Sequence, residues 1–296
     1  MIRKIANVLF ALIFLAGFGI FAYPLVSDQW NAYRQSQLIS TYEQVVAQME
    51  EADYSREWDA ARTFQSAVKR NDFYGDAFGG EGTDLEDTEY WKILNAAEDG
   101  VMGYMTIPEI HVKLAIYHGV GDEVLQTGIG HLEGTGLPIG GEGRHSVLSA
   151  HRGLPSAKLF TDLDRMAKGD IFTVTVLNRI LTYEVDQILI VEPTQMEALN
   201  VTDGRDYCTL LTCTPYGINS HRMFVRGHRI DNIEEEKVVV IAAEARRIPT
   251  YYVIPAVGIP LLFVSLIIML TVSGRKRPKK TGEELLEEFK KNNGYK

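Results

Sequence analysis

The chain of 296 residues has only two cysteines and ten prolines. Two cysteines cannot build a disulfide framework, a four-cysteine zinc site or an iron–sulfur cluster from this chain alone. The sequence also lacks the excess of charge that marks disorder, because 46% of its residues are hydrophobic and only 23% are charged. We therefore expect a folded chain of one or two domains.

Positive charge is scarce in the centre of the chain. Residues 24–249 hold 20 Lys and Arg against 35 Asp and Glu, whereas residues 1–23 and 275–296 carry net charges of +2 and +4. Binding to nucleic acid needs Lys and Arg clustered toward the phosphates. The central segment is therefore not expected to bind nucleic acid.

Charge is absent from two long apolar runs, residues 5–27 and 251–272. Basic residues precede the first run and follow the second. About 20 apolar residues suffice for a helix to cross a membrane, and basic flanks stay in the cytoplasm. The first run could instead be a cleaved signal peptide, although its end lacks a small-x-small cleavage site, and the second could be a buried core helix. We predict two membrane spans, both termini in the cytoplasm and the segment between them outside the cell.

Between these runs the pattern changes from helical to strand-like. Apolar residues at helical spacing predict a helix over Asp28–Met49, with Asp28 as its N-cap, and a second helix over Arg56–Arg70. Residues 71–89 are rich in Gly and acids and predict a mobile loop. After residue 99 the sequence predicts short strands, with a hairpin turn at Asn178-Arg179, and these strands span residues 101–107, 110–118, 145–150, 171–177, 181–191, 207–213 and 223–230.

Seven or eight short strands without regular helices between them predict an antiparallel barrel or sandwich. Short helices are expected only at Lys158–Met166 and Thr194–Leu199. We divide the chain into an anchor (1–27), helices with a loop (28–99), a β domain (100–247), a second membrane helix (248–274) and a basic cytoplasmic tail (275–296). The tail is expected to be at best a frayed helix.

The two cysteines are expected to stay unpaired. Cys208 and Cys213 are five residues apart on one strand, which puts them on opposite faces and about 16 Å apart, beyond the roughly 7 Å that a disulfide allows. Cys208 is expected to pack as a small apolar residue. Cys213 ends its strand before the turn at Thr214–Gly217, which is expected to open the thiol to solvent and makes Cys213 a candidate nucleophile.

A nucleophilic thiol needs a base and a cation nearby. Among seven histidines, His151 stands out because it follows a strand directly and precedes the turn residue Gly153. Arg222 and Arg226 follow Cys213 on the next strand, where either guanidinium could stabilise thiolate or bind a carbonyl. Both arginines lie on one face of that strand, so spacing alone does not choose between them.

These residues together resemble the sortases, the cysteine transpeptidases of Gram-positive cell surfaces. Leu210–Cys213 matches the family's cysteine motif, Arg222 follows Cys213 by nine residues, and His151-Arg152-Gly153 lies upstream. The stretches 151–166 and 213–229 look like class C, the pilus-polymerising sortases. The resemblance implies a mainly β fold, a closed eight-stranded barrel with N-terminal helices and a lid loop, and it selects Arg222 over Arg226.

The resemblance also implies a reaction. Cys213 would attack the Thr carbonyl of a Leu-Pro-x-Thr-Gly sorting signal, His151 would act as general acid and base, and Arg222 would bind the carbonyl or oxyanion. In class C the resulting thioester is resolved by a Lys amine of the next pilin subunit. No cofactor or metal is implied, and we interpret the acids of residues 81–87 as solvated rather than as a calcium site.

Class C sortases carry an Asp-x-aromatic lid over the site. Asp76 and Phe78 fit this pattern, with Ala77 where family members often have Pro, which leaves the lid backbone freer. Asp72 with Tyr74 fits as well, and the loop could equally be acidic and touch nothing. Three alternative functions stay open: a sortase that anchors proteins to peptidoglycan, a hydrolytic cysteine peptidase, and a membrane-tethered β domain without activity.

Overall fold

The computed structural model describes residues 2–68, 76–79, 88–232, 260, 264 and 281–292. It divides into two units, one formed by residues 1–19 with 247–296 and one formed by residues 20–246. Helix α1 (Ile2–Ala47) passes from the first unit into the second, and helix α7 (Gly282–Asn292) lies in the predicted cytoplasmic tail. The expected second span, residues 251–272, lies outside the described residues except for positions 260 and 264, and its crossing of a membrane stays a prediction.

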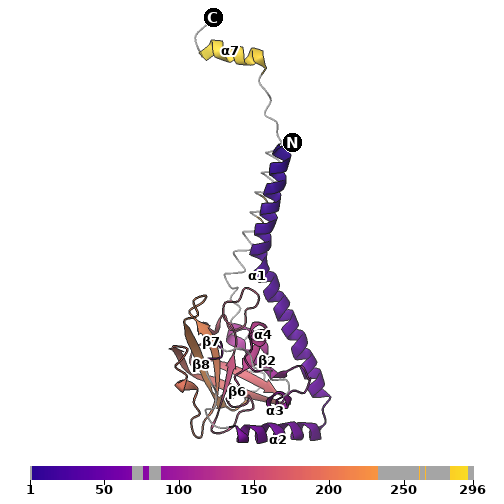
Figure 1. Cartoon of the computed structure of the whole chain (residues 1–296), viewed down its shortest axis with the longest axis vertical. Helices are drawn as coiled ribbons and strands as arrows, with labels where there is room; N and C mark the ends of the chain where they lie inside the picture. Colours follow the sequence, from indigo (N-terminus) through magenta and orange to yellow (C-terminus); the bar gives the residue numbers. More distant parts are fainter. Residues whose placement is uncertain are drawn as a thin grey trace. The chain divides into compact units, whose positions relative to one another are not determined.

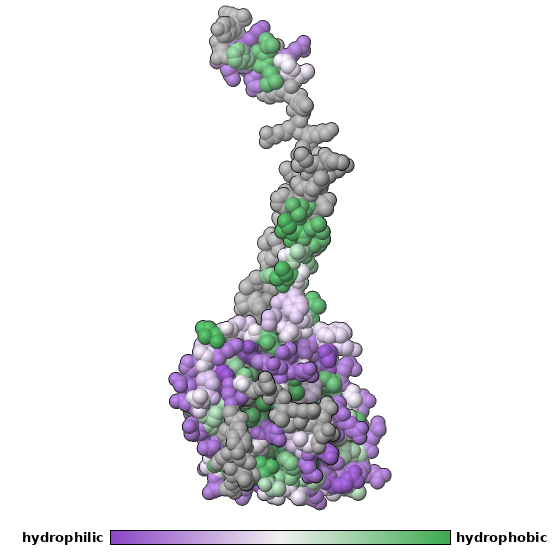
Figure 2. All heavy atoms as spheres, in the orientation of Figure 1, coloured by the Kyte–Doolittle hydropathy of each residue, from purple (hydrophilic) through white to green (hydrophobic). Residues whose placement is uncertain are grey.

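Helix α1 contains the first apolar run and continues well beyond it. In the described part of the chain one helix, Ala11–Ala47, is long and apolar enough to cross a membrane, with a mean hydropathy of 1.7 in its most apolar window. Large apolar side chains are exposed along its N-terminal half, among them Leu12, Ile13, Ile20, Phe21 and Val26. By contrast, the face of the second unit seen in Figure 2 is mainly hydrophilic. The finding is consistent with a membrane anchor at this end.

The expectation that a helix starts at Asp28 is wrong. Asp28 lies inside α1, and its side chain accepts a hydrogen bond from the backbone N–H of Lys158, with an O···N distance of 2.8 Å. An N-cap is required only where a helix begins, and here the apolar run already supplies the preceding helical turns. Asp28 therefore ties α1 to the β domain instead of starting it.

Two shorter helices follow α1 along the chain before the first strand, and Figure 1 shows α2 below the barrel. Helix α2 (Glu51–Ala67) begins earlier than expected because Glu50 and Asp53 form a capping box, and helix α3 (Glu89–Lys92) is capped by Thr88. Helix α1 is fixed to the strands by the hydroxyl of Tyr42, which donates to the carbonyl of Met102 at 3.1 Å and accepts from the N–H of Leu177 at 2.8 Å.

Eight strands form a closed barrel, which confirms the barrel part of the predicted fold. Their order around the barrel is β1-β2-β3-β4-β7-β8-β6-β5. The strands are β1 (Val101–Ile107), β2 (Val112–His118), β3 (Ile129–His131), β4 (Arg144–Ser149), β5 (Ile171–Val176), β6 (Arg179–Val191), β7 (Asp206–Thr214) and β8 (His221–Ile230). One short α-helix and three 3-10 turns connect them, namely α4 (Asp122–Thr127), η1 (Pro108–Ile110), η2 (Leu163–Arg165) and η3 (Glu197–Leu199).

The barrel differs from the sequence expectation in three respects. Two of its pairs, β2 with β3 and β4 with β7, are parallel rather than antiparallel. The hairpin between β5 and β6 turns at Leu177-Asn178, because Val176 already pairs with Arg179 and Leu177 takes the positive φ of 49°. The helices expected over residues 158–166 and 194–199 shrink to the 3-10 turns η2 and η3.

The barrel interior holds the large apolar side chains. Alternation along β5 buries Phe172, Val174 and Val176 while their neighbours are half-exposed. This alternation arises because successive side chains of a strand point to opposite faces, so that every second one faces the barrel interior. Phe172 stacks on Tyr183 of β6, with 5.5 Å between ring centroids, so the strands that carry the site rest on a packed core.

Candidate active site

Strands β7 and β8 place Cys213 beside Arg222. The two strands are antiparallel and their register pairs Cys213 directly with Arg222. Directly opposed residues of an antiparallel pair have side chains that meet on one face. Arg222 is buried, with 7% of its surface exposed, and its guanidinium also donates to the backbone carbonyls of Asn219 and His221 at 3.0 and 3.1 Å.

Strand β4 brings His151 to the same end of the barrel. The strand runs parallel to β7, with Ser149 opposite Leu211. Beyond the strand the pairing continues, since the N–H of Ala150 donates to the carbonyl of Leu211 at 3.2 Å and the hydroxyl of Thr212 donates to the carbonyl of Ala150 at 2.8 Å. His151 is therefore the next residue in line with Cys213.

The short segment 76–79 covers this end of the barrel. The two carboxylate oxygens of Asp76 accept from Nε and Nη2 of Arg222, the first at 2.7 Å. The ring of Phe78 lies 5.3 Å from the ring of His151, and the Arg222 guanidinium lies 5.3 Å from the same Phe78 ring. Ala77 is buried in an apolar cluster with five other buried side chains, Leu132, Val147, Leu199, Leu211 and Phe224.

The cover overturns the expectation that Cys213 is open to solvent. Only 5% of Cys213 is exposed, although the turn predicted after it does follow at residues 215–218. Reasoning from the turn alone predicted an open thiol, whereas the family resemblance had suggested Asp76 and Phe78 as a lid; Asp76 does pair with Arg222 and Phe78 lies against His151. Both cysteines are free thiols, as expected from their spacing.

Burial sets the protonation states in this covered form. It raises the pKa of the Cys213 thiol, an effect that the Arg222 guanidinium opposes and the Asp76 carboxylate reinforces. Burial lowers the pKa of His151, and the nearby carboxylate of Asp122 opposes that shift. Near neutral pH the thiol and the imidazole are therefore both mostly uncharged.

The other candidates of the sequence lie elsewhere. Arg226 forms an ion pair with Asp186 of β6 at 2.9 Å. Among the remaining histidines, burial lowers the pKa of both His131 and His145 to about 4, and both of their rings hydrogen-bond inside the fold. Such groups are structural parts of the barrel.

Thr212 was missed by the sequence reasoning. Its buried hydroxyl holds the chain just before His151 against β7. The only signal was its place between Leu211 and Cys213 in the cysteine motif. In the described part of the chain no group of three or more His, Cys, Asp or Glu side chains could hold a metal ion, and the acidic residues 81–87 lie outside that part.

Comparison with known proteins agrees with this geometry. The Sortase domain family matches residues 105–230. Among solved structures, Streptococcus pneumoniae sortase C is 43% identical with a TM-score of 0.63, covering 66% of this chain and 97% of that one. Sortase C1 of Streptococcus agalactiae is 46% identical with a TM-score of 0.60, covering 67% and 100%.

A more distant curated relative shows the same domain. Sortase A of Streptococcus agalactiae serotype III is 32% identical over 117 residues, which are 38% of this chain and 47% of that protein, so the match spans about half of this relative's length. The solved neighbours are matched over nearly their whole length. We conclude that the chain belongs to the sortase family, with sortases C as its structural neighbours.

Proposed function

We propose that the chain is a class C sortase, a cysteine transpeptidase that polymerises pilin subunits. The observation that carries the proposal is the cluster of Cys213, Arg222 and His151 at one end of the barrel beneath Asp76 and Phe78. The sequence similarity to sortases C, one of which is described in connection with pilin substrate specificity, supports the choice of substrate.

In the first half-reaction the Cys213 sulfur attacks the Thr carbonyl carbon of a Leu-Pro-x-Thr-Gly sorting signal. The S–C bond forms, the Thr–Gly C–N bond breaks, and His151 passes the thiol proton to the departing Gly amine. Arg222 donates to the oxygen on which negative charge develops. For this, Arg222 must leave Asp76, because in the covered form its Nε and Nη2 are both occupied by that carboxylate.

In the second half-reaction a neutral Lys amine of the next pilin attacks the thioester. The new N–C bond forms and the C–S bond breaks. His151 takes the proton that the amine loses and returns it to the departing Cys213 sulfur, which restores the neutral thiol and imidazole. Water is far more abundant than the amine, so the site must hold the thioester dry and position the lysine. We assign this role to the apolar cluster that contains Ala77 and Leu211 of β7 and against which Phe78 packs.

The proposed location follows from the two apolar runs. Residues 5–27 would anchor the chain in the cell membrane, residues 251–272 would return it to the cytoplasmic side, and the barrel would lie outside the cell. The pilin substrates would then be held at the same membrane surface.

The proposal is tested with the purified full-length chain in detergent micelles. A shaft pilin with its sorting signal and acceptor lysine should give isopeptide-linked dimers in mass spectrometry, and the Cys213→Ala variant should give none. The same reaction with a pilin that lacks the acceptor lysine separates the alternatives.

If products form only when a peptidoglycan amine is supplied, the chain is a wall-anchoring sortase. If the free acid of the sorting signal is released even in excess amine, the chain is a hydrolytic peptidase.

A further inference from the structure

Arg152, the residue directly after His151, links the histidine loop to the cysteine strand. Its side chain is only 8% exposed, and its guanidinium reaches Asp164 at 2.5 Å on one side. On the other side Nη1 donates to the hydroxyl of Thr214 at 3.2 Å. Thr214 directly follows Cys213 on β7. The residue that follows His151 therefore makes a direct hydrogen bond to the residue that follows Cys213.

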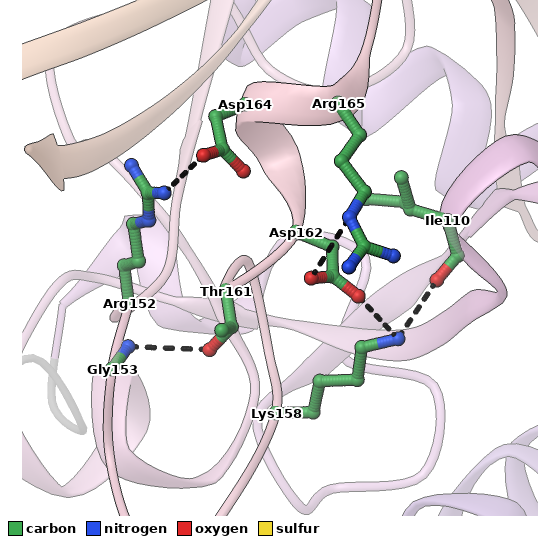
Figure 3. A network of polar contacts seen from close by, with 8 residues as sticks. All are labelled: Ile110, Arg152, Gly153, Lys158, Thr161, Asp162, Asp164 and Arg165. Atoms are coloured by element: carbon green, nitrogen blue, oxygen red, sulfur yellow. Dashed lines mark hydrogen bonds and ion pairs between the residues drawn. The ribbon is translucent and has the colours of Figure 1, made fainter. Parts of the chain in front are cut away.

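The loop after His151 is also held by contacts that do not involve Arg152. The N–H of Phe160 donates to the carbonyl of His151 at 3.2 Å, and the N–H of Gly153 donates to the hydroxyl of Thr161 at 3.2 Å. Figure 3 shows Asp164 directed toward Arg152, and Asp162 directed toward Lys158 and Arg165. The loop therefore keeps its own framework when the contacts of Arg152 are removed.

Stability alone does not explain the placement of this guanidinium. The Nε–H of Arg152 is buried and has no hydrogen-bond acceptor among the described residues. A buried donor without a partner opposes folding, and so does the desolvation of a charge. Buried polar groups left unsatisfied call for an explanation other than packing.

We propose that Arg152 is a positioning residue, which holds His151 in line with Cys213 by bridging Asp164 and Thr214. The inference rests on the proposed function. It predicts that loss of the bridge impairs the proton transfers of His151 and leaves the thiol itself unchanged. Misplacement of a catalytic group by about 1 Å can lower a rate about a hundred-fold.

The test uses the full-length chain in detergent micelles with a sorting-signal peptide and a lysine-containing acceptor peptide. For Asp164→Asn and Arg152→Gln we expect kcat to fall by about ten- to a hundred-fold while KM stays within about twofold. Arg152→Lys keeps the positive charge but cannot contact Asp164 and Thr214 at the same time. Its kcat should therefore lie between those of the wild type and Arg152→Gln. A second readout is alkylation of Cys213 by iodoacetamide in an Asp76→Ala background, which reports the thiolate and needs no general acid.

The alkylation rate should be the same with and without Asp164→Asn. Asp186→Asn is the matched control, since it also removes the carboxylate partner of a partly buried arginine, Arg226, but on the strand pair β6–β8 rather than in the loop. Its kcat should equal that of the wild type. Unchanged kcat in Asp164→Asn and Arg152→Gln would overturn the inference, and so would a parallel loss of alkylation and of thermal stability. A wild-type chain that alkylates at Cys213 but cleaves no peptide would contradict the proposed function as well.

Discussion

Asp76 and Arg222 form a bidentate ion pair that ties segment 76–79 to strand β8 at the candidate site. Both carboxylate oxygens accept from the guanidinium, and the two side chains are only 14% and 9% exposed. The pair blocks the arginine that the proposed reaction requires and adds a negative charge beside Cys213. Opening of the segment would therefore free the arginine and ease ionisation of the thiol together.

The first prediction concerns access to the thiol. Asp76→Ala removes the ion pair and should raise the rate of Cys213 alkylation by at least about tenfold, because one unit of thiol pKa corresponds to tenfold in thiolate. Peptide mass spectrometry after timed labelling measures the rate and separates Cys213 from Cys208, the other free cysteine. Asp59→Ala, at an exposed ion pair on α2, is the control and should change nothing. Equal rates in wild type and Asp76→Ala would show that the segment does not act as a lid.

The second prediction concerns pH. The covered thiol has its pKa raised by burial and by Asp76 and lowered by Arg222, so the wild-type alkylation rate should rise with pH to a midpoint above that of a free thiol. Asp76→Ala removes a raising effect and should move the midpoint to lower pH. Arg222→Ala removes the lowering effect and should move it to higher pH when compared in the same Asp76→Ala background. A midpoint that is insensitive to both changes would refute this electrostatic account.

The third prediction separates the two arginines of β8. Arg222→Ala should lower kcat for sorting-signal cleavage by about a hundred- to a thousand-fold, the usual effect of losing an oxyanion donor. Arg222→Lys should restore only part of the lost kcat, since an ammonium group cannot present two donors in one plane as a guanidinium does. Arg226→Lys is the matched control on the same strand face, where the native side chain pairs with Asp186, and it should keep near-wild-type kcat. An equal loss of kcat in Arg222→Lys and Arg226→Lys would contradict the assignment of Arg222 as the oxyanion donor.

The fourth prediction concerns stability. Tyr42→Phe leaves the buried N–H of Leu177 without its acceptor, so the free energy of unfolding should fall by about 1–3 kcal/mol. Tyr33→Phe on the exposed side of the same helix should change it by less than about 0.5 kcal/mol. Chemical denaturation of the full-length chain, followed by Trp fluorescence, measures both. A Tyr42→Phe chain as stable as Tyr33→Phe would show that α1 is not held by this hydroxyl.

Local patterns predicted the larger parts of the fold. Short runs rich in Val, Ile, Thr and Tyr, separated by Gly, Pro or Asn, identified seven strands. Strand β3 has only three residues, too few for a pattern, and without it the parallel pairs β2–β3 and β4–β7 could not be foreseen. Pairing partners depend on the whole barrel and not on the sequence of any one strand.

The residues of the candidate site could be named from the sequence, but their burial and contacts could not be predicted from it. Strand ends and turns drew attention to His151 and Cys213, and resemblance to a family chose Arg222 and the lid residues. Cys213 is buried at the end of the barrel where Asp76 pairs with Arg222 and Phe78 lies against His151, which are contacts between distant parts of the chain. Likewise, the role of Asp28 changed from a helix cap to a link with Lys158, because the helix did not start where a cap would be needed.

That link has a consequence for how a substrate could reach the enzyme. Ser27 donates to the carbonyl of Pro155 at 3.0 Å and Asp28 accepts from Lys158, so the loop that begins at His151 touches the very residues at which the uncharged run ends. Under the proposed function, these two hydrogen bonds would tie the loop of His151 to the end of the membrane anchor. The length of spacer between a pilin's cleavage sequence and its own membrane segment would then decide which subunits are joined.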